Sequence, residues 1–191
     1  MMNNLSDAQA DMRLGYLSGA PGVLVSGTVW LVAGIVAWRV SPTNAVWALF
    51  VGGALIHPIG VVLTKILGRS GSHTPGNPLA SLAAANTCWL IFSLPLAYAV
   101  SLLRIEWFFP AMLLVIGGRY LTFDVLYGMR IYWLCGGALA LAGFLLGREL
   151  AQPAVSAVTG GAIELCFGAW ILWVGRRESR EPSDPDRQQA A

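Results

Sequence analysis

The stretch LGYLSGAPGVLVSGTVWLVAGIVAW, at residues 14–38, runs for 25 residues without a charged side chain. A helix needs about 20 predominantly apolar residues to cross the hydrocarbon core of a bilayer. The stretch is therefore long enough to span a membrane as one helix. It also carries no basic segment at its N-terminal side, so we expect a retained signal anchor and not a cleaved signal peptide.

The rest of the chain has the same character. Hydrophobic residues make up 56% of the 191 residues and charged residues 12%, whereas about 25% of the residues in a soluble domain are charged. The first 175 residues hold only 14 of the 22 charged side chains. This composition excludes a soluble enzyme, a nucleic-acid-binding protein and a disordered chain. It predicts an all-α, polytopic helix bundle embedded in a lipid bilayer.

The gaps between charged residues predict six transmembrane helices. Three charge-free windows reach span length directly, and a fourth, 131–147, is at the short end of the range. The other two reach span length only if Arg119 and Glu164 lie inside the membrane. The predicted spans are 20–39, 44–64, 79–102, 107–125, 130–148 and 153–175.

The two ends of the chain differ from this pattern. Residues 1–18 are predicted to be a cytoplasmic amphipathic segment, with a helix over 5–17 on the membrane surface; a frayed terminus is the alternative. Ser6 and Gln9 have the spacing of a capping box. Residues 19–175 then form the transmembrane domain. Residues 176–191 contain proline and alternating charges, which is typical of a disordered cytoplasmic tail.

The distribution of basic residues predicts the orientation. With six spans, the side that holds both termini carries nine basic residues including Arg119, and the opposite side carries three. The positive-inside rule therefore places both termini in the cytoplasm. The loops on the opposite side are very short, so we expect the function to reside in the membrane or at its cytoplasmic face.

Four polar side chains on four predicted helices fall at a similar depth. Counted inward from the outer helix ends, Arg119 and Glu164 lie roughly 18 and 17 Å deep, and His57 and Asn86 roughly 20 and 24 Å. Thr28 lies roughly 16 Å from the outer end of the first span. An ionisable residue in the hydrocarbon usually faces the bundle interior and has a partner. We therefore predict an ion pair between Arg119 and Glu164 within a polar layer.

Small residues on the same helix faces support this layer. Glu164 lies on a stripe with Ser156, Gly160 and Gly168, and small residues allow neighbouring helices to approach closely. His57 is predicted to share an inward face with Gly53, Gly60 and Thr64, and Pro58 to bend that helix. Further candidate site residues follow Arg119 toward the inner end of the fourth and fifth spans: Tyr120, Asp124, Tyr127 and Arg130.

Residues 11–34, DMRLGYLSGAPGVLVSGTVWLVAG, resemble the opening of an uncharacterised bacterial family, a domain of unknown function, of small multi-pass membrane proteins. The resemblance implies a bacterial inner-membrane protein. It implies no activity, cofactor or site residue.

Three functions remain open from the residues alone. The first is a small-solute or ion transporter or channel-like protein, in which Arg119 attracts an anionic group and Glu164 or His57 exchanges a proton. The second is a structural or assembly subunit or a homodimer, in which the polar layer only fixes packing and the GxxxG pair Gly143 and Gly147 serves dimerisation. The third, a membrane enzyme acting on a lipid-like substrate, is the weakest, since no catalytic constellation is present. The pattern predicts no metal site and no cofactor.

Overall fold

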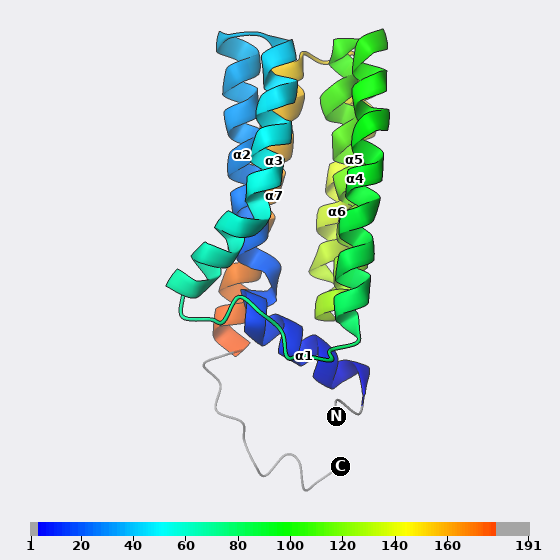
Figure 1. The fold of residues 1–191 in the computed structure, drawn as a ribbon. Coiled ribbons are helices and arrows are strands. Elements are labelled where there is room, and N and C mark those ends of the chain that lie inside the picture. Colours follow the sequence, from blue (N-terminus) through cyan, green and yellow to red (C-terminus); the bar gives the residue numbers. More distant parts are fainter. Residues whose placement is uncertain (1–3, 179–191) are drawn as a thin grey trace, which may run out of the picture.

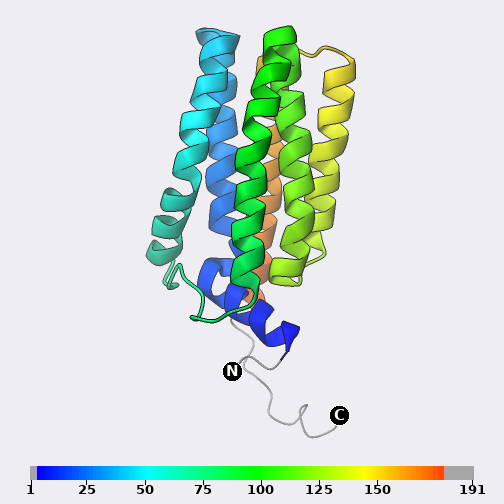
Figure 2. The same ribbon diagram turned by 45° about the vertical axis from the view of Figure 1, so that its right-hand side comes forward.

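The computed structural model describes residues 4–178, and its regular elements in this range are all helical. Figures 1 and 2 show a bundle of long helices with one short helix across its end. In chain order the elements are α1 (Leu5–Tyr16), η1 (Leu17–Gly19), α2 (Ala20–Arg39), α3 (Pro42–Ile66), α4 (Leu79–Leu103), η2 (Ile105–Trp107), α5 (Phe108–Tyr127), α6 (Ile131–Arg148) and α7 (Pro153–Glu178).

The six predicted spans are confirmed as helices. Six helical segments between residues 5 and 176 are long and apolar enough to cross a membrane, so the chain is a multi-pass membrane protein by its composition and helix lengths. Their bounds follow local signals. Pro42 and Pro153 begin α3 and α7, where a missing N–H costs little, and the Ser41 hydroxyl caps α3 by accepting a bond from the Asn44 N–H at 3.1 Å.

The bundle consists of two groups of helices, which we call lobes (Figure 1). The first lobe contains α2, α3 and α7, and the second contains α4, α5 and α6; α2 packs most extensively on α7 and α3, and α5 on α6. In each lobe two helices cross at glycines. A Cβ atom on Gly27 would lie 3.0 Å from the Gly161 carbonyl oxygen, and one on Gly136 would lie 2.5 Å from that of Gly117.

The GxxxG pair predicted for dimerisation is used inside the chain. A Cβ on Gly143 would lie 2.8 Å from the Pro110 carbonyl oxygen of α5, and one on Gly147 would lie 3.2 Å from the Pro110 side chain. The pair therefore lets α6 approach the start of α5. The prediction that it offers a surface to a second copy was wrong, because sequence spacing shows a small face but not which helix covers it.

α3 changes direction near its middle, as predicted from Pro58. Its C-terminal part, teal in Figure 1, runs at an angle away from the bundle, since an internal proline removes one helix hydrogen bond and clashes with the preceding turn. The predicted inward face of α3 is correct only in part. Gly60 and Thr64 are buried, but Gly53 and His57 are exposed.

α1 lies across one end of the bundle, which we call the α1 end (Figure 1). The predicted helix forms, so the alternative of a frayed terminus is wrong. Its N-cap is Asn4, whose side chain accepts a bond from the Asp7 N–H at 2.8 Å, and not the predicted Ser6. The chain then turns into α2 through Leu17, Ser18 and Gly19, whose φ angles are 50°, 56° and 81°. At the other terminus α7 extends to Glu178, and the rest of the predicted tail lies outside the described residues.

Candidate functional site

Glu164 lies at the centre of the bundle. Its side chain is fully buried, and its Oε1 atom accepts a 2.7 Å hydrogen bond from the Tyr120 hydroxyl of α5. The Ser26 hydroxyl of α2 lies beside the same carboxyl group. Three helices from both lobes therefore meet at one carboxyl group. We call Glu164, Tyr120, Ser26 and Arg119 the polar cluster.

The local sequence of α7 explains why Glu164 faces inward. The other members of its predicted stripe, Ser156, Gly160 and Gly168, are also buried. A Cβ atom on Gly160 would lie 2.9 Å from the Trp30 ring, and one on Gly168 would lie 2.9 Å from Leu24. The absent side chains bring the α7 backbone close to α2, and this close packing directs the carboxyl group into the bundle.

Arg119 lies near Glu164 without pairing with it. Within residues 4–178 it forms no ion pair; its guanidinium lies over the Phe123 ring, with Cζ 5.5 Å from the ring centroid. The predicted ion pair between Arg119 and Glu164 is therefore wrong, and the Glu164 carboxyl group is instead bonded to the Tyr120 hydroxyl. Neighbouring residues of a helix point about 100° apart, so the turn that directs Tyr120 at Glu164 directs Arg119 to the side.

The polar cluster leaves two buried atoms without partners. Among the described residues, neither Glu164 Oε2 nor Arg119 Nε has a hydrogen bond. Nearly all buried polar atoms in proteins are paired, so such exceptions need an explanation. The free carboxyl oxygen is able to carry a proton or to accept a bond from a bound group, and the guanidinium is able to donate one.

The remaining candidates of the predicted layer separate into two groups. Asn86 is buried on α4, and its Nδ2 atom has no hydrogen-bond partner within residues 4–178. His57 and Thr28 are exposed, and the Thr28 hydroxyl donates to the Leu24 carbonyl of its own helix at 2.9 Å. The structure therefore does not bring His57 or Thr28 to Glu164. α3 packs mainly on α2, which buries a narrow face of α3, and His57 lies beside that face.

The candidates near the inner end of α5 also lie apart. Asp124 accepts a 3.3 Å bond from the Trp133 indole N–H, Tyr127 is buried, and Arg130 is exposed. Within residues 4–178 no hydrogen bond or ion pair joins these three. The same range holds no group of three or more His, Cys, Asp or Glu residues suited to a metal ion.

An aromatic column connects the polar cluster to the α1 end, and the sequence analysis missed it. The Tyr120 ring lies 5.9 Å from the Tyr132 ring, which stacks on Tyr127 at 5.6 Å. The Tyr132 hydroxyl donates a 2.6 Å bond to the Ser18 carbonyl. The column therefore links Glu164 to the left-handed turn between α1 and α2. Tyr120 and Tyr127 were candidates from the sequence, but their contacts with Tyr132 gave no sequence signal, because these contacts depend on how α5 and α6 cross.

A network of hydrogen bonds that sequence reasoning also missed attaches α1 to the bundle. The Asp11 carboxylate accepts bonds from the Thr74 N–H, the Thr74 hydroxyl and the Asn77 amide at 2.9, 2.6 and 2.8 Å. At the end of α5, in the second lobe, the Arg13 guanidinium donates to the Tyr127 carbonyl at 2.6 Å. The Gln9 side chain donates to the Val125 carbonyl of the same helix at 2.8 Å. α1 is thus attached to both the 67–78 loop and the end of α5.

Comparison with known protein families gives a match over most of the chain. Residues 5–174 match a family described as a family of unknown function, DUF7010. No curated protein and no solved structure matches the chain.

Proposed function

We propose that this chain, which belongs to the DUF7010 family, is a small-solute or ion transporter whose exchange centre is the carboxyl group of Glu164. One observation carries the proposal: a fully buried carboxyl group in a six-helix membrane bundle keeps one oxygen atom without a hydrogen-bond partner among the described residues. An ionisable residue within a membrane usually marks a substrate, ion or proton pathway.

The incomplete pairing favours transport over a purely structural role. A buried polar network that is only partly satisfied is less stable than an apolar core of the same shape. The free positions on Glu164 Oε2 and Arg119 Nε therefore reduce stability unless a second ligand or a proton occupies them. A transporter needs such positions, because its centre has to be loaded and emptied.

The residues of the polar cluster then have distinct roles. Glu164 exchanges a proton, and Tyr120 orients it through the hydrogen bond to Oε1. Arg119, held over Phe123, attracts an anionic group, so the transported solute is a small anion that moves together with protons. Asn86, whose amide Nδ2 has no partner in the described part of the chain, offers a further polar contact on α4.

The protein is proposed to lie in a bacterial inner membrane. The distribution of charge supports an orientation with both termini in the cytoplasm. Arg13, Lys65, Arg69, Arg130 and Arg176 lie at the α1 end, whereas Arg39, Arg104 and Arg148 lie at the opposite end.

Cysteine labelling in intact cells tests this orientation. Gln152 is exposed in the α6–α7 loop at the end opposite α1, and Ser6 is exposed on α1. A membrane-impermeant maleimide is expected to label Q152C in intact cells, and S6C only after the membrane is permeabilised. The three native cysteines are located in α4, α6 and α7, so the unsubstituted protein serves as the control. Labelling of S6C alone in intact cells would show the reverse orientation.

Proton flux in proteoliposomes tests the function. The Glu164→Gln variant keeps the shape of the side chain and an oxygen for Tyr120 but cannot exchange a proton. We expect the wild type to acidify vesicles that contain a pH-sensitive dye when an inward gradient of small anions is applied. The variant should lose this flux at least about a hundredfold, as when a group essential for proton transfer is removed.

The matched control is Glu149→Gln. Glu149 is exposed at the opposite end and pairs with Arg148 at 3.3 Å, so the same chemical change occurs outside the polar cluster. Flux equal to that of the wild type is expected for this variant. Equal flux in the Glu164 and Glu149 variants contradicts the proposal.

A structural role is the second candidate, and one contact favours it. The Tyr120–Glu164 bond joins α5 of the second lobe to α7 of the first. If Glu164→Gln lowers the melting temperature of the purified protein and no flux is found for the wild type with any tested anion, the polar cluster serves lobe packing alone.

A further inference from the structure

The two lobes are connected differently at their two ends. The chain passes from the first lobe to the second through the long 67–78 loop at the α1 end, and it returns through the short 149–152 loop at the opposite end. An extended chain spans at most about 3.3–3.6 Å per residue. The longer loop therefore leaves the lobes room to move apart at the α1 end, whereas the shorter loop keeps them close at the other.

Aromatic rings also join the lobes toward the end opposite α1. The Phe50 ring of α3 lies 5.4 Å from the Phe108 ring of α5, and the Trp47 ring of α3 lies 6.0 Å from the Tyr98 ring of α4. Phe108 is fully buried. Because these contacts and the short 149–152 loop hold the lobes together here, we call this end the hinge end.

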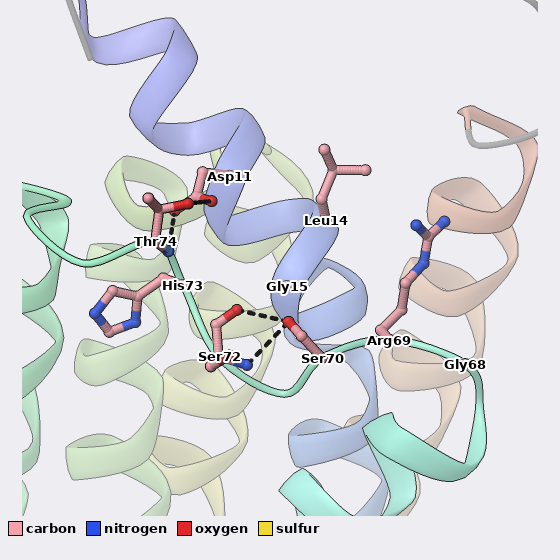
Figure 3. Close-up of a pocket in the computed structure, with 9 residues that line it drawn as sticks. All are labelled: Asp11, Leu14, Gly15, Gly68, Arg69, Ser70, Ser72, His73 and Thr74. Atoms are coloured by element: carbon pink, nitrogen blue, oxygen red, sulfur yellow. Dashed lines mark hydrogen bonds between the residues drawn. The ribbon is translucent and has the colours of Figure 1, made fainter. Parts of the chain in front are cut away.

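At the α1 end, α1 itself crosses between the lobes. It continues into α2 of the first lobe and runs beneath the second lobe (Figure 1). Its Arg13 and Gln9 side chains donate to carbonyl groups at the end of α5. Figure 3 shows that its Asp11 carboxylate is bonded to Thr74 of the 67–78 loop. α1 therefore connects the lobes through side-chain hydrogen bonds, which break more easily than a packed apolar contact re-forms elsewhere.

The turn that joins α1 to α2 is strained. Leu17 and Ser18 have φ angles of 50° and 56°, in the left-handed region that is costly for residues with a Cβ atom. Such conformations persist only where the surrounding structure holds them, and they are typical of switch regions. Here a bond from the second lobe holds the turn, because the Tyr132 hydroxyl of α6 donates to the Ser18 carbonyl at 2.6 Å. Movement of α6 away from the turn lets it relax.

We propose that α1 is a strap that closes the α1 end of the bundle, and that its release lets the lobes part there about the hinge end. The Tyr120–Glu164 bond joins the two lobes, so this movement separates the two side chains and opens Glu164 to water from the α1 end. Rocking of one bundle against another is a common way for transporters to expose a central site. The role of the strap as a gate rests on the proposed function, but the movement of the lobes does not.

Distances between spin labels test the movement. The labels are placed at R130C in the second lobe and R176C in the first, both exposed at the α1 end, in a chain whose native cysteines are replaced by alanine. In the wild type we expect one predominant short distance. Tyr132→Phe, which loses only the bond to Ser18, should raise the ratio of long to short distances about fivefold. Arg13→Gln, which loses a charged donor, should raise it roughly tenfold.

Two control variants make the same chemical changes away from the strap. Tyr98→Phe removes a tyrosine hydroxyl at the hinge end, and Arg39→Gln removes an exposed guanidinium that lies over the Trp38 ring. Neither should change the distances. A second label pair, T43C and R104C, is exposed in opposite lobes at the hinge end. Its distance should stay constant in all four variants.

The outcomes separate the strap from transport, because the distances are measured without a solute gradient. Longer distances at the α1 end alone, in both test variants and neither control, support the strap even if Glu164→Gln keeps full flux, which removes the transporter. Unchanged distances in Arg13→Gln, which also decides the question if Tyr132→Phe does not fold, overturn the strap even where flux depends on Glu164. Equal lengthening at both ends, or equal lengthening in the controls, overturns it as well.

Discussion

Replacement of Gly136 by valine is expected to destabilise the protein by about 2–3 kcal/mol, the upper part of the range for overpacked cores. A Cβ atom at this position would lie 2.5 Å from the Gly117 carbonyl oxygen, and one on Gly117 would lie 2.7 Å from that of Gly136. The two backbones touch at this crossing, so neither helix has a flexible side chain that can move aside. Valine therefore forces α5 and α6 apart, and Tyr120 moves with α5. The effect is measured as a lower melting temperature in detergent.

The neighbouring glycine is the control. A Cβ atom on Gly137 would meet no other atom within 4 Å, because this residue faces away from α5. Gly137→Val makes the same chemical change one residue further along the same helix and should leave the melting temperature nearly unchanged. If the two valine variants have the same melting temperature, the α5–α6 crossing does not depend on close backbone contact.

Release of α1 is the second large effect that we expect, after Asp11→Ala. The substitution removes the acceptor of three hydrogen bonds, to the Thr74 backbone, the Thr74 hydroxyl and the Asn77 amide. Bonds to a charged group contribute about 1.5–3 kcal/mol each when buried, but this group is partly exposed, so we expect about 2 kcal/mol for the set. The amides of residues 5–16 should then exchange with deuterium faster, whereas those of α5 and α6 should not change.

Asp7→Ala is the control for α1. Asp7 is on the same helix and exposed, and the structure gives its side chain no bond to the 67–78 loop. A small change from the helix dipole, about 0.3–1 kcal/mol, is the most that this variant should show. Equal exchange in the Asp11 and Asp7 variants would mean that the apolar contacts of Met12, which is 2% exposed, attach α1 without the network.

The six spans could be predicted because the signals that define them can be read directly along the sequence. Charge spacing and proline positions do not depend on how helices pack, and α2 begins at Ala20 and ends at Arg39 as expected. Gly143 and Gly147 show the limit of such signals. Their spacing predicts a face that admits a close neighbour, but only the structure shows that the neighbour is Pro110 of the same chain.

The burial of Glu164 could be predicted from the sequence, but its hydrogen-bond partner could not. Glu164 lies inside the bundle because its stripe of small residues is periodic in the sequence. Its bond to Tyr120 in place of Arg119 depends on the rotation of α5 about its axis, and one residue changes that direction by about 100°. The contacts of α1 with Thr74 and Asn77 join residues more than 60 positions apart. A periodic pattern of residue types within one helix cannot predict contacts of this kind.

The central claim is that Glu164 exchanges its proton with the aqueous phase. Infrared difference spectra of reconstituted wild type and Glu164→Gln isolate the carboxyl band of this one residue. We predict that the band shifts when the medium is changed to D₂O and that its amplitude changes with the pH of the medium. A Glu164 band that neither shifts in D₂O nor responds to pH would show a carboxyl group sealed from water, and it would contradict the account.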